Sequence, residues 1–391
     1  MTEIDKFDVF NSARARFLRF IARKYLSDIP CENLSLIIVT HLLPDRPVFI
    51  ETLSRHFGIQ HVIAIPYSTN ELVAGWVSQR FPLWRPTLSE LQDGEGLRKI
   101  VHTKGDNKAI LAEIGGYGAG LLGGQDELAK SRILGVVEGT EAGLRAYQSI
   151  GAPAVPVVCL SLSPVKDAEA TLVGPACFFS TNVILRRLGY CNELRRACVL
   201  GYGRVGQSIA ATLSANGIST SVFDPNPERR LAALSAGLSV PSREEGLRQA
   251  DIVFGAAGKL SWTEADARHM RQQSFLVSCS SKDAEFEFAK LARTHGADRL
   301  VEGVHAIDIG GKRLNFLNEG APINFRDGAN AGPVLTLLQA EMVAAMGEIA
   351  LRSLPPGIQA PSEAIRAAIL KAWFEFYIDP ISGWYRPGFT R

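Results

Sequence analysis

Residues 197–224, ACVLGYGRVGQSIAATLSANGISTSVFD, decide the fold class of this chain. The stretch begins with a short apolar run typical of a buried strand and ends with a second β-prone run that closes on an acid. Between them, Gly201, Gly203 and Gly206 have the G-x-G-x-x-G spacing. In a strand–turn–helix unit these glycines permit a tight turn, a close approach of backbone N–H groups to a pyrophosphate, and packing of helix on strand. The stretch therefore predicts a dinucleotide-binding α/β unit.

The acid that closes this stretch, Asp224, indicates which dinucleotide binds. A carboxylate at this position accepts hydrogen bonds from the adenosine ribose hydroxyls, and its charge opposes a 2′-phosphate. The pyrophosphate is expected at the positive end of the helix, where Arg204 and Val205 lie. We therefore expect NAD as the cofactor. Arg229 and Arg230 follow closely enough to leave NADP as an alternative, and an α/β unit with a vacant turn is the structural alternative.

Composition narrows the class of protein further. With 391 residues, 46% apolar and 21% charged, the chain is expected to be a soluble globular protein of two or three domains. A net charge of +2 gives no general electrostatic case for nucleic acid or an anionic membrane, and no run reaches the roughly 18 uncharged apolar residues of a membrane span. The six cysteines form no C-x-x-C pair and the start is charged, so we expect no metal site, no secretion signal and a cytoplasmic protein.

Apolar runs elsewhere in the chain alternate with helical patterns and predict parallel sheet with helices on its faces. The expected strands of the first part lie at 34–40, 61–66, 109–113, 131–138 and 154–160. An amphipathic helix over 334–351 comes too late for the dinucleotide unit, so the chain is expected to return to its first domain. We predict an α/β protein with two doubly wound parallel-sheet domains and a short C-terminal tail. The expected bounds are a substrate domain over 1–183 and 333–375, an inserted Rossmann domain over 184–332, and an aromatic, basic tail over 376–391 that docks on a surface or a partner subunit.

Several motifs follow one another along the chain in a recognisable order. They are HLLPDRPVFIETL (41–53), IPYSTNE (65–71), ILAEIGG (110–116), EGTEAGL (138–144), SPVK (163–166), the glycine turn, KDAEFE (282–287) and RLNFLNEGAPINF (313–325). This series resembles the S-adenosylhomocysteine hydrolases (adenosylhomocysteinases), and the chain is identified as a divergent member of that superfamily. The resemblance implies a tightly bound NAD that is used without net consumption. The ribose 3′-hydroxyl is oxidised, the C4′ proton becomes acidic, the 5′ substituent leaves, and the hydride is returned.

The resemblance also implies roles for four catalytic positions. His41 falls on the histidine near the 5′ position, and Lys166 on the lysine that helps to deprotonate the 3′-hydroxyl. Glu113 replaces an aspartate of the C4′ and C5′ chemistry, and Ser281 replaces the histidine of a G-H-F-D motif. Without the resemblance, a strand-end histidine capped by backbone and a surface lysine would be the simpler interpretations.

Binding residues are implied in the same way. Asp45 falls on the acid that recognises the adenine amino edge, and a solvated loop acid is its structural alternative. Ser68 and Thr69 belong to a substrate-binding motif. A family acid aligns with Gly139, and Glu138 or Glu141 is its possible substitute. On the cofactor side the expected residues are Thr140, Gly201, Gly203, Arg204, Val205, Gly206, Asp224, Gly258 and Asn324, the last holding the nicotinamide carboxamide.

Departures from the family pattern bear on the reaction. Ala170-Thr171 stand where the family has an Asp-Asn pair, and residues 332–335 (GPVL) stand where it has H-P-S-F. Losing one general base commonly costs about 10²–10⁴ in rate, so the usual thioether hydrolysis is expected to be altered. We expect a homodimeric or homotetrameric lyase of dehydratase type that eliminates the 5′ substituent of an adenosine-type nucleoside. A true S-adenosylhomocysteine hydrolase, a non-catalytic NAD-binding regulator and a hydroxy-acid dehydrogenase are the alternatives.

Overall fold

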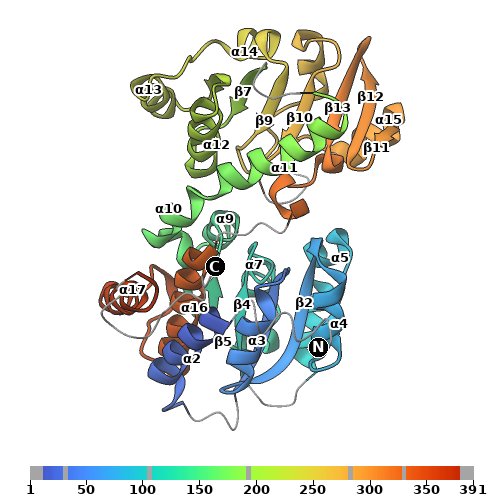
Figure 1. The fold of residues 1–391 in the computed structure, drawn as a ribbon. Helices are drawn as coiled ribbons and strands as arrows, with labels where there is room; N and C mark the ends of the chain where they lie inside the picture. The colour runs from blue at the N-terminus through green and yellow to red at the C-terminus, as the bar shows by residue number, and fades with distance from the viewer. Residues whose placement is uncertain are drawn as a thin grey trace. The chain divides into compact units, whose positions relative to one another are not determined.

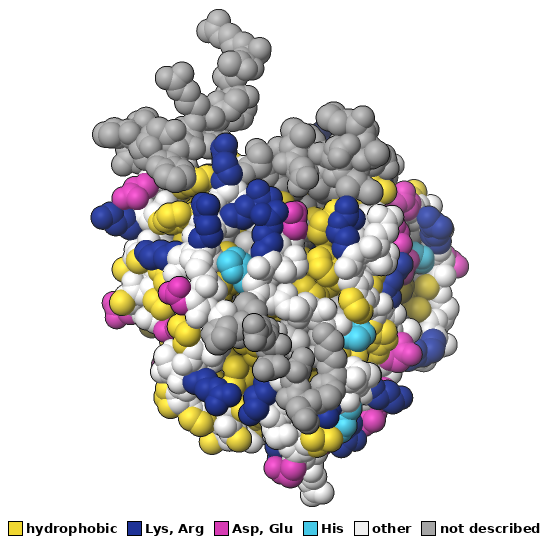
Figure 2. All heavy atoms as spheres, turned by 90° about the horizontal axis from the view of Figure 1, so that it is seen from below, with side chains coloured by type: hydrophobic (Ala, Val, Ile, Leu, Met, Phe, Trp, Pro, Cys, Tyr) yellow, Lys and Arg dark blue, Asp and Glu magenta, His cyan; other side chains and the backbone are white. Residues whose placement is uncertain are grey.

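The computed structural model describes residues 12–29, 34–103, 108–190, 195–280, 285–327 and 332–378. The chain divides into two compact units (Figure 1). Unit 1 comprises residues 1–166 and 332–391, and unit 2 comprises residues 167–331. From the sequence, the chain was expected to pass from one domain to the other near residues 183 and 332. In the structure the helix α11 (Val173–Arg187) falls wholly within unit 2. The predicted tail beyond residue 378 lies outside the described residues, and residues outside them are grey in Figure 2.

Unit 1 is built on a seven-stranded sheet in which every pair of neighbouring strands is parallel. Its order is β14 (Gly357–Gln359), β6 (Pro156–Cys159), β5 (Ile133–Glu138), β4 (Lys108–Glu113), β1 (Leu34–Leu42), β2 (Gly58–Thr69) and β3 (Leu83–Trp84). The central strands are apolar almost throughout because helices cover both faces. The strand order reverses between β1 and β4, and in open α/β sheets ligands bind beyond the carboxyl ends of the strands at such a switch point.

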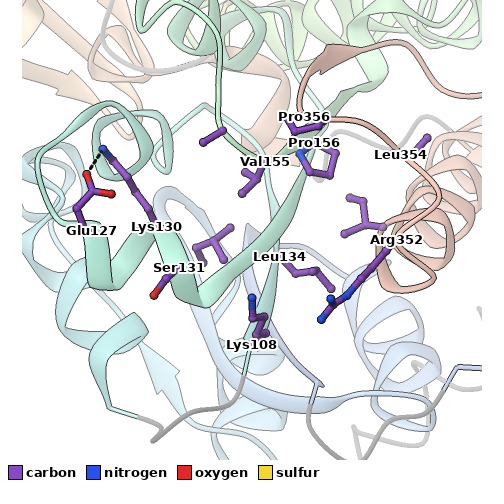
Figure 3. Close-up of a pocket in the computed structure, with 13 residues that line it drawn as sticks. Lys108, Glu127, Lys130, Ser131, Leu134, Val155, Pro156, Arg352, Leu354 and Pro356 are labelled. Carbon is purple, nitrogen blue, oxygen red and sulfur yellow. Dashed lines mark hydrogen bonds and ion pairs between the residues drawn. The ribbon is translucent and has the colours of Figure 1, made fainter.

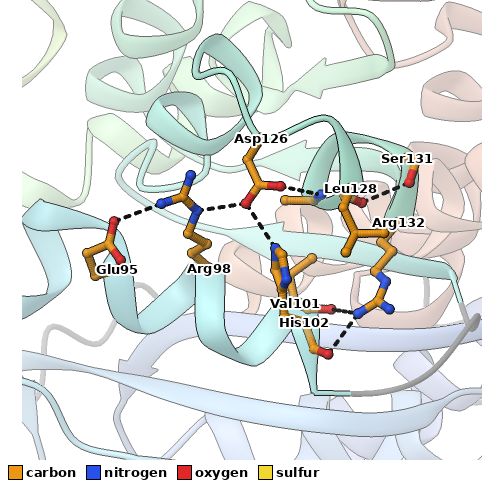
Figure 4. A network of polar contacts seen from close by, with 9 residues as sticks. Glu95, Arg98, Val101, His102, Asp126, Leu128, Ser131 and Arg132 are labelled. Carbon is orange, nitrogen blue, oxygen red and sulfur yellow. Dashed lines mark hydrogen bonds and ion pairs between the residues drawn. The ribbon is translucent and has the colours of Figure 1, made fainter.

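Two layers of helices enclose this sheet, and a separate apolar cluster forms on each face. One face is covered by α2 (Ser12–Leu26), α3 (Arg46–Ser54), α4 (Glu71–Ser78), α16 (Leu335–Ala350) and α17 (Glu363–Tyr377). The other is covered by α5 (Leu88–Asp93), α6 (Glu95–His102), α7 (Ala119–Gly123), α8 (Glu127–Arg132) and α9 (Glu141–Ser149). On the second face, Asp126 joins two of these helices, because its carboxylate caps α8 at Ala129 and accepts from Arg98 (2.6 Å) and His102 (2.9 Å) of α6 (Figure 4).

The helix α16 is the central helix of unit 1 rather than a surface element. Gly135 lets it approach β5, since a Cβ there would lie 2.7 Å from Ile349, and Gly347 lets it approach α2 at Tyr25.

Two helical stretches, Val165–Arg187 and Gly332–Ala350, are long and apolar enough to cross a membrane by length and composition alone. The second is 72% buried inside the protein, as expected of a core helix.

Unit 2 holds the second sheet, in which the strands nearest the glycine turn are parallel. Its order is β11 (Asp298–Val301), β12 (Val304–Ile309), β13 (Lys312–Leu317), β10 (Phe275–Ser278), β9 (Ile252–Gly255), β7 (Arg196–Leu200) and β8 (Ser219–Phe223). The strand β12 is antiparallel to both of its neighbours, an edge that the sequence did not predict. The predicted class, two doubly wound α/β sheets, is confirmed with this addition.

The helices of unit 2 flank this sheet and pack closely on one another. They are α11, α12 (Arg204–Ala215), α13 (Pro227–Ser235), α14 (Arg243–Gln249) and α15 (Phe288–His295), with α10 (Val165–Ala170) leading in. The helix α11 lies against α12 at Gly174, where a Cβ would meet the Ser208 carbonyl at 2.3 Å. The Ser208 hydroxyl accepts from the Gly174 N–H at 2.9 Å, which pins α11 to α12. The strand order reverses between β7 and β9, so the switch point of unit 2 lies directly at the glycine turn.

Candidate active site

The glycine turn has the geometry that a pyrophosphate requires. Gly201 has φ +104°, a conformation that side-chain-bearing residues rarely adopt, and a Cβ on Gly206 would lie 2.0 Å from the Gly201 carbonyl oxygen. By contrast, the nearest atom to a Cβ on Gly203 belongs to Arg229, at 3.8 Å, so the space above this glycine is open. The helix α12 begins at Arg204 with no side-chain cap, which leaves its first-turn N–H groups for an anion.

Asp224 lies directly after β8 and supports the turn from within the protein. Its two carboxylate oxygens accept the backbone N–H groups of Tyr202 (2.7 Å) and Asn226 (2.9 Å), and its side chain is only 3% exposed. A carboxylate oxygen can accept a second hydrogen bond, so this structural role is compatible with the predicted contact to the ribose. Arg229 stands 3.6 Å from the same carboxylate.

Two further cofactor positions lie in unit 2. The side-chain oxygen of Asn324 is buried and has no hydrogen-bond partner among the described residues, so it fits a donor such as the amide of a nicotinamide carboxamide. The N–H of Gly258, which has φ +68°, donates to Glu285 at 2.7 Å. Glu285 is wholly buried, and burial raises its pKa. It lies within the KDAEFE motif, but sequence reasoning did not single it out.

The remaining predicted positions of the turn are more exposed. Arg204 is an exposed residue that pairs with Asp167 at 2.5 Å, and Val205 is half-buried in the first turn of α12. Ser281, the substitute for a family histidine, lies outside the described residues. The turn, the orphaned Asn324 oxygen and the buried acid together fit a nicotinamide dinucleotide.

In unit 1, His41 lies within β1 near its carboxyl end, whereas the sequence predicted that this strand ends at residue 40. Its Nδ1 makes a short hydrogen bond with the hydroxyl of Ser68, which lies near the end of the neighbouring strand β2. Burial, and then the charges of Arg46 and Lys166, hold the pKa of His41 well below its usual value of 6.5. His41 is therefore a neutral imidazole at pH 7, beside a lysine. Thr69 instead turns its hydroxyl to the carbonyl of Ile65 (2.9 Å).

Asp45 is buried and paired rather than solvated. It precedes α3, and one carboxylate oxygen accepts from the side-chain amide of Gln339 (2.9 Å) and lies 3.3 Å from Nε of Arg46. Because Gln339 belongs to α16, the late helix fixes the acid that the resemblance assigns to adenine. Sequence reasoning missed Gln339, and only the prediction that 334–351 returns to the first domain pointed towards it.

Two acids end neighbouring strands of unit 1 and are wholly buried. Glu113 ends β4, Glu138 ends β5, and the parallel register pairs them. Glu138 accepts from the backbone N–H groups of Gly115 (3.1 Å), Gly116 (2.9 Å) and Thr140 (2.6 Å), and from the Thr140 hydroxyl (2.7 Å). Burial raises the pKa of Glu138, and these donors offset part of that rise because they favour the charged form. Thr140 is therefore engaged within unit 1, and its predicted contact to the cofactor stays a prediction.

Glu113 carries the proton of this pair. It accepts from the Gly118 N–H (3.0 and 3.2 Å) and from the Tyr147 hydroxyl. Burial, and then the charge of Glu138, raises the pKa of Glu113 to about 8. A neutral Glu113 beside a charged Glu138 thus ties residues 115–118 to the strand ends. This arrangement favours a positioning role for Glu113, and the catalytic role implied by the resemblance stays a prediction.

Lys166 lies in the first turn of α10, which follows β6 and a short 3-10 helix (Leu160–Leu162). The turn before it is clamped, because the Ser163 hydroxyl donates to Glu341 (2.9 Å) and accepts from the Val165 N–H (3.2 Å). Glu341 belongs to α16, and burial raises its pKa to about 7. No motif in the sequence pointed to Glu341. The ends of β1 and β2 therefore bring His41 and Ser68 together, and Lys166 lies close enough for its charge to act on His41.

Comparisons with known proteins point to one family. A family model described as S-adenosyl-L-homocysteine hydrolase, NAD binding domain, matches residues 190–329. The adenosylhomocysteinase of Aeropyrum pernix is 25% identical over 312 residues, 76% of this chain and 73% of the relative. That of Sulfolobus acidocaldarius is 24% identical over 315 residues, 78% of this chain and 74% of the relative. Among solved structures, a glyoxylate reductase from Paecilomyes thermophila aligns with 82% of this chain and 98% of its own at 12% identity and a TM-score of 0.42.

The family model identifies the cofactor, and the two relatives support the same family for the rest of the chain. The family model covers the glycine turn and nearly all of unit 2, so the predicted cofactor, NAD, is confirmed. The alignments of 312 and 315 residues are longer than unit 2, so they extend into the unit that carries His41 and Lys166. These findings support the identification of this chain as a divergent member of the S-adenosylhomocysteine hydrolase superfamily.

Proposed function

We propose that this protein is an NAD-dependent enzyme that acts on an adenosine-type nucleoside by transient oxidation at C3′ and elimination of the 5′ substituent. The observation that carries the proposal is the pairing of His41 with Ser68 at the carboxyl edge of the unit 1 sheet, within reach of the charge of Lys166, in a chain whose other unit binds NAD. Open α/β sheets bind their ligands at that edge, next to the switch point between β1 and β4.

The chain's own side chains suit the proton transfers of this reaction. Lys166 would take the proton of the 3′-hydroxyl, and bound NAD would supply a hydride acceptor that returns the same hydride at the end. Removal of the C4′ proton then breaks the bond from C5′ to its substituent and leaves a 4′,5′ double bond. A neutral His41 beside a serine hydroxyl can accept the C4′ proton and, as the imidazolium that this forms, give that proton to the leaving group. Reduction of the ketone completes a redox-neutral elimination.

Substrate orientation would come from groups that the fold already holds rigidly. Asp45, held by Gln339 and Arg46, presents a carboxylate for the adenine amino group. Glu113 and Glu138 hold the glycine-rich segment 115–118 in place at the same edge. The assignment of the adenine edge to Asp45 rests on the resemblance, whereas the rigidity of its side chain rests on these contacts.

A second candidate is the hydrolysis that the relatives' name describes. The relatives in Aeropyrum pernix and Sulfolobus acidocaldarius are named adenosylhomocysteinase, and the oxidation and elimination steps would be shared. The two candidates differ after elimination, where the hydrolase adds water at C5′. The substitutions at Ala170-Thr171 and at 332–335 favour the first candidate because they remove polar family residues without replacing them.

The deciding experiment follows the cofactor and the products separately. The NAD-loaded protein is mixed with adenosine, and absorbance at 340 nm reports the reduced cofactor; 3′-deoxyadenosine, which has no 3′-hydroxyl, is the matched control. We expect reduction with adenosine only. Incubation with S-adenosylhomocysteine is then followed by chromatography. A 4′,5′-unsaturated nucleoside supports elimination, homocysteine with adenosine supports hydrolysis, and no reduction with any nucleoside leaves a non-catalytic NAD-binding protein.

The assembly and location that we propose follow from the same family. A homodimer or homotetramer in the cytoplasm is expected, and light scattering of the purified full chain tests the assembly. A monomer at micromolar concentration would contradict it.

A further inference from the structure

A second concave site lies in unit 1, where β4, β5 and β6 begin, whereas His41 and Glu113 lie where β1 and β4 end (Figure 3). The cavity has a volume of about 440 Å³. Its apolar wall is made by side chains that include Leu134, Val155 and Ile349. It is therefore separate from the proposed nucleoside site by the length of the strands.

The charges at this cavity are unbalanced. Lys108, at the start of β4, and Arg352, two residues past the end of α16, both line it, and neither side chain has an ion pair or hydrogen bond to any described residue. In Figure 3 the guanidinium group of Arg352 reaches towards the side on which Lys108 lies. A third cation, Lys130, is neutralised by Glu127 at 2.9 Å. Two cations facing one apolar cavity attract an anion.

Arg352 has a backbone conformation that residues other than glycine rarely adopt. Its φ is +53°, in the left-handed region that glycine normally occupies just after a helix. Unusual backbone conformations of this kind cluster at functional sites. A cation near a helix C-terminus also interacts favourably with the helix dipole, which could account for Arg352 but not for Lys108 on the facing strand.

We propose that this cavity binds a small organic anion with an apolar body. The carboxylate or phosphate of the ligand lies between Lys108 and Arg352, and its apolar part lies on Leu134, Val155 and Ile349.

The test uses the full chain saturated with NAD, so that the cofactor site does not compete. The probe is 8-anilinonaphthalene-1-sulfonate, and the neutral N-phenyl-1-naphthylamine is its uncharged partner. We expect Lys108→Ala and Arg352→Gly each to weaken binding of the sulfonate about threefold to tenfold, while binding of the neutral probe is unchanged and Lys99→Ala, on the exposed face of α6, changes neither. Competition by inorganic phosphate assigns the site to phosphorylated ligands, and competition by acetate assigns it to carboxylates.

Arg352→Gly separates binding from folding. Glycine adopts φ +53° without strain, so this variant is expected to melt at the same temperature as the parent or higher while it binds the probe less well. Sulfonate binding that is absent from the parent chain, that is unchanged in either variant, or that falls together with binding of the neutral probe would overturn the proposal.

Discussion

The two switch points of this protein are built in opposite ways. In unit 2 the turn that would hold the pyrophosphate lies within one continuous stretch, where Gly201 and Gly206 have steric reasons to be glycine and Gly203 leaves open space. In unit 1 the site is assembled from strand ends and a late helix, so that His41 and Gln339, almost 300 residues apart, serve one edge. The difference teaches that a backbone-made cofactor turn tolerates little change, whereas side chains on strand ends can be exchanged one by one.

The contrast also bears on how the reaction could diverge. The backbone of unit 2 binds the part of NAD that is common to many enzymes, while unit 1 supplies the side chains that face the substrate. Substitutions relative to the family pattern, such as Ala170-Thr171, need not disturb the glycine turn. If the proposed function is correct, changes in unit 1 should alter the reaction, and changes at the turn should alter cofactor affinity.

The largest effect is expected at the proposed base in unit 1. Lys166→Ala should slow nucleoside-dependent cofactor reduction by about 10²–10⁴, because a general base is lost, while NAD stays bound. Stopped-flow absorbance at 340 nm measures the first quantity, and thermal stabilisation by NAD measures the second. Lys99→Ala is the control for loss of a surface lysine. Reduction at the parental rate in Lys166→Ala would remove this residue from the mechanism.

The next largest effect is expected at the cofactor turn. Gly203→Ala should fold normally, because a Cβ there meets nothing closer than 3.8 Å, but should weaken NAD binding by about 10–100-fold through lost hydrogen bonds to a charged group. Gly206→Ala should also unfold more easily, since its Cβ would lie 2.0 Å from the Gly201 carbonyl oxygen. Isothermal titration with NAD and thermal melting without NAD distinguish the two. Gly75→Ala, with no atom within 4 Å of its Cβ, is the control. If Gly203→Ala binds NAD as tightly as the parent does, the glycine turn does not bind the pyrophosphate as proposed.

A third prediction concerns the buried acids of unit 1. The pKa of Glu113 is about 8 in the folded chain and about 4.5 ordinarily, so the folded chain holds one more proton than the unfolded chain between these values. The resulting stability is fully present below about pH 4.5 and is lost as pH rises through about 8. Glu113→Gln cannot titrate, so its free energy of unfolding should fall less between pH 5.5 and pH 8.5. Urea unfolding at three pH values measures this difference, with Glu127→Gln as the exposed control.

The same variant tests the role of Glu113 in the reaction. A positioning role predicts that Glu113→Gln, which has the shape of the protonated acid, keeps cofactor reduction within about fivefold of the parent. A loss of about 10² or more would instead establish the acid–base role that the family resemblance implies. In the urea experiment, if the free energy of unfolding of Glu113→Gln falls with pH as steeply as that of the parent, the extra proton of the folded chain is not on Glu113.

Much of the fold could be predicted from the sequence because its signals are local. The strand predicted over 109–113 matches β4 to within one residue, and the glycine spacing predicted the cofactor turn. The ends of β1 and β2 could not be predicted, because polar His41 and Ser68 look like loop and helix-start residues. Pairing with the neighbouring strand, Leu42 with Thr69, extends both strands through these polar residues.

What was missed depends on contacts between distant residues. The strands β11 and β12 form an antiparallel edge, and the side chains of β11 are mostly exposed, so no apolar alternation marks this strand. Gln339, Glu341 and Tyr147 belong to helices, and nothing in their local sequence indicates that each contacts Asp45, Ser163 or Glu113. The proposed site residues of unit 1 were found through the family motifs, whereas the residues that hold them in place were visible only in three dimensions.

The smallest effect is expected at Arg229, which stands beside the turn without being part of it. Its guanidinium lies 3.6 Å from the Asp224 carboxylate and is half exposed, and exposed ion pairs contribute only about 0.2–1 kcal/mol. Arg229→Ala should therefore change NAD affinity by no more than about fivefold. The same change should reduce any binding of NADP more strongly, because it removes the cation nearest to a 2′-phosphate and leaves the negative charge of Asp224 unopposed. Titration of both dinucleotides into both proteins checks this difference, with Arg145→Ala in α9 as the control for a surface arginine. If Arg229→Ala loses more affinity for NAD than for NADP, a side chain as well as the backbone holds the cofactor. The contrast between a backbone-made site in unit 2 and a side-chain-made site in unit 1 would then be wrong.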